Sequence, residues 1–271
     1  MKPILKAISG LALAIFIISS CSTNPYAPAN RSYKKQVKEL SKSIREFHNV
    51  SGIGSSAKYP VATVNFNLRK PNYVIIHHTA QNACEKTLET FTSSKAQVSA
   101  HYVVCKDGTV HHMLNDYLRA WHGGVAKWGT LTDINSASIG IELDNNGSEP
   151  FTESQINSLV LLLTKLKKDY NVPTPNFIGH SDIAPGRKVD PSVFFPWKKL
   201  SEAGFGNWPD AILDTVPAGF KSVQALRMIG YDTRDSLSAI RAFKLHFLPY
   251  DLTPVLTDST KRILNNLVRK Y

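Results

Sequence analysis

The sequence predicts an α/β fold, in which strands and helices alternate, followed by a small C-terminal domain of three helices. Two observations carry this prediction. Short apolar runs typical of buried strands alternate with segments of helical period in the first two thirds of the chain. After a stretch rich in Gly and Pro, at residues 201–218, only patterns typical of short helices follow.

Five apolar runs are the expected strands. The clearest is Val74-Ile75-Ile76, which is as short and as apolar as a buried strand. The second and third runs meet at Asp107-Gly108, a dipeptide typical of a tight hairpin turn. The expected strands cover residues 74–76, 101–105, 109–113, 139–143 and 177–179.

Helical periodicity is clearest after Thr152. Thr152 and Gln155 have the spacing of a capping box, and apolar residues then recur every three or four positions until Val172-Pro173. A further helix is expected over residues 85–98. In the C-terminal unit the pattern predicts three helices, at residues 220–229, 236–247 and 259–269.

The N-terminus carries the features of an export signal. Residues 1–20 contain two lysines followed by an apolar run too short to span a bilayer comfortably. Ile18-Ser19-Ser20-Cys21 resembles a bacterial lipobox, in which the Cys becomes the first residue of the mature chain and carries lipid. The alternative is an ordinary signal peptide with a chance Cys. We expect a lipoprotein signal peptide at 1–20, lipidation at Cys21 and a lipidated tether over residues 21–45.

The residue after Cys21 indicates the compartment. Ser22 stands where Asp often signals retention at the inner membrane, so the sequence favours a lipid anchor in the outer membrane, facing the periplasm. Cys84 and Cys105 would then lie in an oxidising compartment. They can form a disulfide or remain two buried thiols.

Composition and charge limit the function classes. The 271 residues are 42% hydrophobic and 20% charged, which excludes a disordered, collagenous or coiled-coil chain. The formal net charge of +11 favours a polyanion such as nucleic acid, an anionic membrane or a cell-wall polymer. Nucleic acid has only this charge in its favour, and we expect no nucleic-acid partner. No protein partner is implied.

Three polar residues stand where strands end. His77 follows the first apolar run, His180 follows the last, and Asp190 comes ten residues later across a tight turn. Two histidines and one carboxylate suit a catalytic zinc site, which has three protein ligands and an open fourth position. The pattern alone is weak, because each residue type is common at strand ends without a metal.

Three local motifs strengthen the zinc hypothesis. They are Val74-Ile75-Ile76-His77-His78-Thr79-Ala80, Ser138-Ile139-Gly140-Ile141-Glu142 and the thirteen residues 179–191. In this order they resemble the zinc-dependent N-acetylmuramoyl-L-alanine amidases of the type 2 family, over roughly residues 60–200. The resemblance implies a mixed central β-sheet flanked by helices, with Zn²⁺ in a cleft of a catalytic domain at residues 46–205.

The resemblance also implies roles for individual residues. His77, His180 and Asp190 match the metal ligands, Glu142 the catalytic glutamate and Lys188 the catalytic lysine. Such a glutamate moves a proton between water and the leaving amine. A lysine beside it stabilises the developing oxyanion.

His101, Trp121 and His122 resemble positions that line the family's cleft, and are expected to contact substrate or to support the cleft. Arg187 is a candidate contact for the carboxylates of the stem peptide. The substrate implied is peptidoglycan or its muropeptides, cleaved between N-acetylmuramic acid and L-alanine. Residues 215–271 resemble a helical peptidoglycan-binding domain. Since they carry no cluster of metal-binding residues, we expect zinc binding and cleavage of small substrates to survive their removal.

Two other functions compete with the amidase. One is a peptidoglycan-binding lipoprotein without catalysis, but such relatives lose a zinc ligand, and all three are present here. The other is a zinc endopeptidase that cuts the stem peptide. Those enzymes typically use other ligand spacings, such as His-Glu-x-x-His, which is absent.

Overall fold

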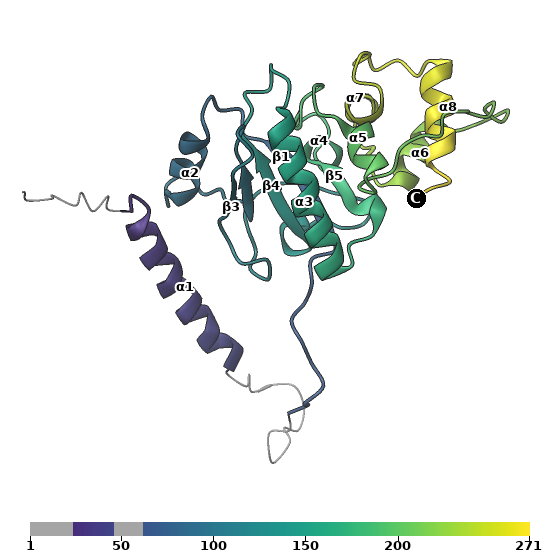
Figure 1. Ribbon diagram of the computed structural model, residues 1–271. Helices are drawn as coiled ribbons and strands as arrows, with labels where there is room; N and C mark the ends of the chain where they lie inside the picture. Colours follow the sequence, from purple (N-terminus) through teal and green to yellow (C-terminus); the bar gives the residue numbers. More distant parts are fainter. Residues whose placement is uncertain (1–23, 46–61) are drawn as a thin grey trace, which may run out of the picture. The chain divides into compact units, whose positions relative to one another are not determined.

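The computed structural model describes residues 24–45 and 62–271 (Figure 1). The predicted signal peptide and Cys21 lie outside these residues. Two compact units are found, Met1–Pro60 and Val61–Tyr271, and each is described by itself. No helix in the described residues is both long enough and apolar enough to cross a membrane.

The described part of the first unit is a helix, α1 (Ala27–Arg45), none of whose residues is buried. The sequence analysis assigned this segment to a tether and predicted no helix in it. The helix begins where the Asn24 side chain accepts a hydrogen bond from the Tyr26 backbone N–H, 2.9 Å away. Pro28 is tolerated because it lies in the first turn. Lys, Gln, Glu and Leu, all good helix formers, dominate the rest.

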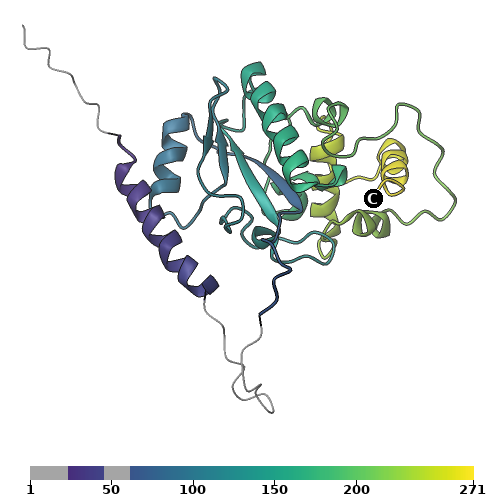
Figure 2. The same cartoon turned by 60° about the horizontal axis from the view of Figure 1, so that its bottom comes forward.

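The second unit is built on one mixed sheet of five strands in the order β3-β2-β4-β1-β5 (Figures 1 and 2). β1 pairs in parallel with β4 and β5, and β2 pairs in parallel with β4 and antiparallel with β3. The mixed sheet and all five predicted strands are confirmed. Their bounds are β1 Tyr73–His78, β2 Tyr102–Val104, β3 Val110–His112, β4 Ser138–Leu143 and β5 Phe177–Gly179.

One face of the sheet is covered by α3 (Glu153–Tyr170). Val74, Ile76 and Ile141 point to this face and share a buried cluster with the apolar side of α3. Thr152 caps the helix as predicted, accepting a hydrogen bond from the Gln155 N–H. The Gln155 side chain does not complete the capping box.

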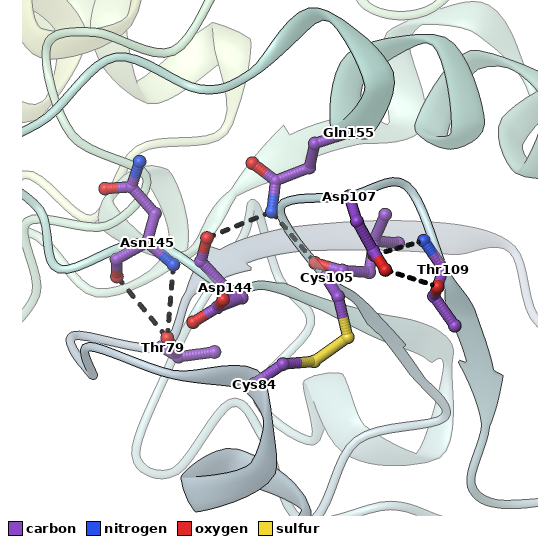
Figure 3. The surroundings of a disulfide bond; sticks show 9 residues. Thr79, Cys84, Cys105, Asp107, Thr109, Asp144, Asn145 and Gln155 are labelled. Atoms are coloured by element: carbon purple, nitrogen blue, oxygen red, sulfur yellow. Dashed lines mark hydrogen bonds between the residues drawn. A yellow bond between two sulfur atoms is a disulfide. The ribbon is translucent and has the colours of Figure 1, made fainter.

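Gln155 instead ties α3 to the ends of two strands. Its Nε2 donates to the carbonyl oxygens of Val104 and Asp144, at 2.9 and 3.0 Å (Figure 3). Beside this contact, Cys84 and Cys105 are joined by a disulfide that links the first residue of α2 (Cys84–Thr92) to the residue after β2. α2 is shorter than the predicted helix over residues 85–98.

The opposite face packs against the C-terminal helices α6 (Ser222–Ile229), α7 (Ser236–Phe247) and α8 (Asp258–Leu267), which lie at the β5 end of the sheet (Figures 1 and 2). The three predicted helices are present, but they do not form a core of their own. Ile75 and Ile178 from the sheet share one buried cluster with Leu226, Phe243 and Leu264. The shorter elements are α4 (His180–Ile183), α5 (Trp197–Glu202), and the 3-10 turns Ile134–Ser136 and Thr174–Asn176.

Candidate functional site

The site forms where the carboxyl ends of β1, β4 and β5 meet. In the parallel pairing His77 lies opposite Glu142, and Ile76 lies opposite Gly179, which immediately precedes His180. Side chains paired in this way point to the same face of the sheet. Local strand register therefore brings His77, Glu142 and His180 together, at the edge where open α/β sheets bind ligands.

Three ligand-type atoms converge at this edge. The Nδ1 atoms of His77 and His180 are 2.9 Å apart, and the Asp190 Oδ2 lies 3.1 Å from the first and 2.9 Å from the second. All three residues are buried. Two imidazole nitrogens and a carboxylate oxygen, with no fourth protein group in the set, suit a divalent cation such as zinc with an open coordination position.

Asp190 reaches the histidines because the chain turns back after α4. The backbone N–H groups of Arg187 and Lys188 both donate to the Ala184 carbonyl, at 3.1 and 3.0 Å. Gly186 has a φ of +76°, which the turn requires and which glycine adopts without strain. The Ser181 N–H then donates to the Asp190 carbonyl at 2.8 Å, which fixes Asp190 beside the start of α4.

A chain of hydrogen bonds sets the tautomer of His77. The Ser138 hydroxyl donates to the Ile134 carbonyl, 2.6 Å away, so its oxygen accepts from the His122 Nε2–H at 3.2 Å. The His122 Nδ1 then accepts from the His77 Nε2–H, 3.1 Å away. The His77 Nδ1 is left with its lone pair toward the converging atoms, which is how partners behind a metal-binding histidine orient it.

His180 is oriented in the same way from the other side. Its Nε2 donates to the Gly123 carbonyl, 3.1 Å away, and its Nδ1 faces Asp190. Arg187 donates to the same Gly123 carbonyl from Nη2 and to the Val125 carbonyl from Nε. Arg187 thus holds the loop at residues 123–125 against His180.

Burial and neighbouring charges decide the protonation of the ligand atoms. Burial, reinforced by His180, lowers the pKa of His77 to about 4. Burial, then the neighbouring His77, lowers the pKa of His122 well below its usual value. For Asp190, burial opposes ionisation, but the close approach of the His180 and His77 rings outweighs it and lowers the pKa. Neutral imidazoles and an ionised carboxylate are the forms that bind a metal.

Glu142 stands next to this cluster with one free oxygen. Its Oε2 is buried and has no hydrogen-bond partner in the part of the chain that the structure describes. Burial, followed by the charge of Asp190, raises the pKa of Glu142 to about 8, while Lys188 acts in the opposite direction. A buried carboxylate oxygen without a partner, facing a cavity, is suited to hold a proton in transit.

The cluster opens into a cavity of about 360 Å³. Glu142, Lys188, Trp121 and Arg187 all line it, together with α2 on one wall. Trp121 is 48% exposed, so it belongs to the cavity rim and not to the core. Among the residues that the sequence analysis placed in a cleft, these four lie where a ligand can reach them.

Of the two roles expected for His101 and His122, substrate contact or support of the cleft, the structure favours support. His101 is fully buried and does not line the cavity, since its Nε2 donates to the Leu118 carbonyl and its Nδ1 accepts from the Gly140 N–H, at 2.9 and 3.0 Å. His122 borders the cavity, but both its ring nitrogens are used by His77 and Ser138. Both residues support the site and are not free to bind substrate.

The approach of His122 to the sheet depends on Gly140. A Cβ atom at Gly140 would lie 2.4 Å from the His122 Cγ, so no larger residue fits without moving the ring. The Asn135 side chain holds the backbone on the other side, accepting from the N–H groups of His122 and Gly123, at 3.2 and 2.8 Å. The position of His77 therefore depends on residues that bind no metal themselves.

Gly140→Ala and His122→Ala should each weaken zinc binding by about 10- to 100-fold, because both changes release His77 from its hydrogen-bonded partner. Competition titration against a zinc-binding dye measures the affinity. His112→Ala is the matched control, since its side chain is half-exposed on β3. Unchanged zinc affinity in both test variants would show that the His122 chain does not orient the ligand.

The C-terminal helices also reach this site, which the sequence analysis missed. Asp182, two residues after His180, accepts hydrogen bonds from the Tyr231 hydroxyl at 2.7 Å, from His246 Nδ1 at 2.8 Å and from the Gly179 N–H at 2.7 Å. His246 is a buried structural histidine that braces the segment carrying His180.

The functional residues that sequence reasoning missed share one property. Ser138, Asn135, Asp182, Tyr231 and His246 act through hydrogen bonds to residues far away in the sequence. Ser138 and Asp182 lie inside the quoted motifs. Their closeness in the sequence to Glu142 and His180 could have marked them as residues of the site. Nothing local marks Tyr231 or His246.

Comparisons with known proteins agree with this site. A protein-family profile described as N-acetylmuramoyl-L-alanine amidase matches residues 67–193. The chain is 31% identical over 230 residues to the N-acetylmuramoyl-L-alanine amidase AmiD of Escherichia coli, a match that covers 73% of this chain and 82% of AmiD.

Two solved structures share the fold over most of the chain. AmiD from Escherichia coli, in complex with the substrate anhydro-N-acetylmuramic acid-L-Ala-D-γ-Glu-L-Lys, superposes with a TM-score of 0.67 at 28% identity, covering 80% of this chain and 96% of that one. AMPDH3 from Pseudomonas aeruginosa, in complex with anhydromuramic pentapeptide, gives a TM-score of 0.68 at 29% identity, covering 81% of this chain and 99% of that one.

Proposed function

Since the chain belongs to the N-acetylmuramoyl-L-alanine amidase family and is an amidase of that type, we propose how its own residues cleave a muropeptide with the help of zinc. The bond cleaved joins N-acetylmuramic acid to L-alanine. One observation carries the proposal: the Nδ1 atoms of His77 and His180 and the Asp190 Oδ2 converge beside the unpartnered Oε2 of Glu142.

His77, His180 and Asp190 would hold the zinc ion. Their donor set is the one that catalytic zinc sites use, with three protein ligands. A zinc ion bound there supplies Lewis acidity, which polarises the amide carbonyl and makes water acidic enough to attack near neutral pH. His122 accepts a hydrogen bond from His77 Nε2, and the Gly123 carbonyl accepts one from His180 Nε2. These contacts keep the proton of each ring on Nε2, so that the lone pair of Nδ1 is free to bind the metal.

Glu142 would act as the general base and then as the general acid. Its Oε2 takes a proton from the attacking water and returns it to the nitrogen of L-alanine as the amide breaks. The free oxygen and the raised pKa both suit this exchange, because a carboxyl that titrates near neutral pH can both accept and release a proton. A zinc ion held by His77, His180 and Asp190 would favour the carboxylate form of Glu142 and so lower its pKa from the metal-free value.

Lys188 would stabilise the oxygen that gains negative charge during attack. It lines the same cavity as Glu142, and its charge already lowers the pKa of that carboxyl. A fixed cation in a partly enclosed cavity interacts more strongly with developing charge than one in water.

Trp121 and Arg187 would bind the two ends of a muropeptide. The exposed Trp121 ring offers an apolar surface to a sugar face. Arg187 sits at the cavity with its guanidinium oriented by the Gly123 and Val125 carbonyls, and a guanidinium is a good partner for the carboxylates of a stem peptide.

Mass spectrometry of digests of a soluble anhydro-muropeptide tests the proposal. We expect free, intact stem peptides from the zinc-loaded protein, and none after chelation or from His77→Ala, His180→Ala or Asp190→Ala. Zinc content, measured by elemental analysis, should fall in all three variants and stay normal in His112→Ala. Shortened stems would identify an endopeptidase, and no products from a zinc-loaded protein would identify a binding protein. Full zinc occupancy in the three variants would refute the ligand assignment.

We propose that the enzyme is anchored by lipid on Cys21 to the outer membrane, facing the periplasm. The lipobox-like Ile18-Ser19-Ser20-Cys21, and Ser22 after it, support the proposal. Cys21→Ala should move the protein from the membrane fraction to the soluble periplasmic fraction, as measured by fractionation of cells expressing the full chain. If the substituted protein still sediments with outer membranes after a high-salt wash, Cys21 is not the anchor.

A further inference from the structure

Helix α1 carries a narrow apolar stripe that no other described residue of its own unit covers. Tyr33, Val37, Leu40 and Ile44 follow each other at intervals of four, three and four residues. At 3.6 residues per turn they fall within a sector of about 60°. Leu40 and Ile44 are 54% and 78% exposed. A stripe of this kind normally packs against another apolar surface.

The opposite side of α1 is strongly basic. The helix carries six Lys and Arg residues and a single acidic residue, Glu39. By the same helical geometry the six basic residues fall within one arc of about 100° on the polar side. Lys34 and Arg45 border the apolar stripe most closely. The basic residues are Arg31, Lys34, Lys35, Lys38, Lys42 and Arg45.

This combination fits the surface of an anionic phospholipid bilayer. Apolar side chains on one face enter the interface between headgroups and acyl chains, while a helix with an excess of basic residues is attracted to anionic headgroups. The helix is too polar to cross a bilayer, which leaves the plane of the interface as its place in a membrane.

A second copy of the chain fits the stripe less well. As a coiled coil, the stripe would place Val37 and Ile44 at one core position and Tyr33 and Leu40 at the other. The flanking positions that set pairing hold Lys34, Gln36, Ser41 and Ser43, so they offer no complementary ion pairs. The pattern also spans fewer than three heptads, which is short for a stable coiled coil.

We propose that α1 is a membrane-surface helix that lies in the interface of an anionic bilayer and binds it independently of any lipid on Cys21. The enzyme would then hold the membrane at two points, the lipidated N-terminus and the helix. The proposal does not depend on the amidase activity, because α1 belongs to the other compact unit and contributes no residue to the cavity.

Vesicle flotation tests the proposal with a protein that begins at residue 22. It keeps every described residue and lacks both the acylated Cys21 and the apolar signal segment. We expect it to float with vesicles of phosphatidylethanolamine and phosphatidylglycerol and to bind phosphatidylcholine vesicles at least tenfold more weakly. Binding should weaken as salt rises, because exposed charges are screened.

Paired substitutions separate the two faces. Leu40→Gln with Ile44→Gln should reduce binding to anionic vesicles at least tenfold. Lys38→Gln with Lys42→Gln should weaken it and flatten its salt dependence. Ser32→Gln with Ser43→Gln is the matched control, since both positions lie outside the apolar stripe and the basic arc, and its binding should be unchanged. All variants should hydrolyse a soluble muropeptide at the rate of the parent protein.

Three outcomes would overturn the proposal. Equal binding to anionic vesicles and to phosphatidylcholine vesicles would show that the basic residues of α1 do not select an anionic surface. A dimer by light scattering, lost in Leu40→Gln with Ile44→Gln and without vesicle binding, would make the stripe a contact between copies. Sedimentation with purified sacculi that is lost in Leu40→Gln with Ile44→Gln, again without vesicle binding, would make α1 a cell-wall element. Failure of hydrolysis in every protein would count against the proposed function and not against this inference.

Discussion

Glu142→Gln should lower the turnover of a soluble muropeptide by about 10²- to 10⁴-fold and leave the zinc content unchanged. The loss is expected because an amide side chain cannot take a proton from water, and removal of a general acid or base typically costs that factor. Gln keeps the volume of the side chain, and Glu142 Oε2 makes no hydrogen bond in the described residues that the substitution would break. Steady-state kinetics with elemental analysis of zinc measures both quantities.

The pH dependence provides an independent check on Glu142. Burial raises the pKa of this carboxyl to about 8, above its ordinary value of 4.5. In the metal-free protein, folding therefore favours the protonated form of Glu142. The contribution of this carboxyl to the stability of the folded protein is fully present below pH 4.5 and is lost as the pH rises through about 8.

Thermal unfolding in the presence of a chelator measures this contribution. As the pH rises from about 5 to about 8, the Tm of the metal-free protein should fall more than that of Glu142→Gln, which has no such group to ionise. Parallel Tm curves, or turnover of Glu142→Gln near that of the parent enzyme, would show that Glu142 is not the proton carrier.

Truncation after Pro217 should abolish both zinc binding and hydrolysis. The sequence alone led to the opposite expectation, that the helical C-terminus is dispensable for both. The structure reverses it, since α6–α8 share one buried cluster with Ile75, Ile178 and Ile183. Tyr231 and His246, which hold Asp182 beside the ligand His180, would be lost as well.

The magnitude follows from the apolar surface that truncation exposes. Uncovering a buried Ile or Leu costs about 1.5–3 kcal/mol. Exposing Ile75, Ile178 and Ile183 would therefore lower the free energy of unfolding by roughly 5–9 kcal/mol. A typical domain has a total free energy of unfolding of about 5–15 kcal/mol. The truncated chain is expected to be largely unfolded.

Circular dichroism and zinc titration of the truncated protein check this prediction. A folded, zinc-binding product that cleaves soluble muropeptides would show that the C-terminus is a separable domain after all. The sacculus-binding role that we predict for residues 215–271 needs a different test, because truncation would remove the fold with it. Substitutions at exposed positions such as Met228, which is 65% exposed, leave the core intact.

The sequence was sufficient for elements whose signal is local. Five strands and the main helices follow from apolar runs and periodicity, and His77, Glu142 and His180 meet because they lie at the carboxyl ends of three neighbouring parallel strands. Lys188 and Asp190 lie after the turn that follows His180. A short motif can predict such a site because strand register alone brings its side chains together.

Features that depend on distant partners could not be predicted in this way. His122 was expected to contact substrate or to support the cleft, and the choice depends on Gly140, which leaves room for the ring behind His77. The C-terminal helices were expected to form their own core, because nothing in their sequence shows that Ile75 and Ile178 complete it. In both cases the deciding contact joins residues far apart in the chain.

Helix α1 was missed for a different reason. Asn, Pro, Ser and Ala near residue 24 are typical of a tether, and this composition masked the periodic spacing of the apolar residues that follow. Tyr33, Val37, Leu40 and Ile44 carried a local signal that periodicity could have detected.

The contact between Asp182 and the C-terminal helices also affects the order of events during biosynthesis. All three metal-binding residues have left the ribosome once Asp190 has emerged, but Tyr231 and His246 follow some forty to sixty residues later. Leu264 and Leu267, which close the shared core, come almost at the end of the chain. A growing chain thus holds the ligands without the framework that orients them. Stable metal binding is therefore expected only once the helices that carry Tyr231, His246 and Leu264 have packed on the sheet.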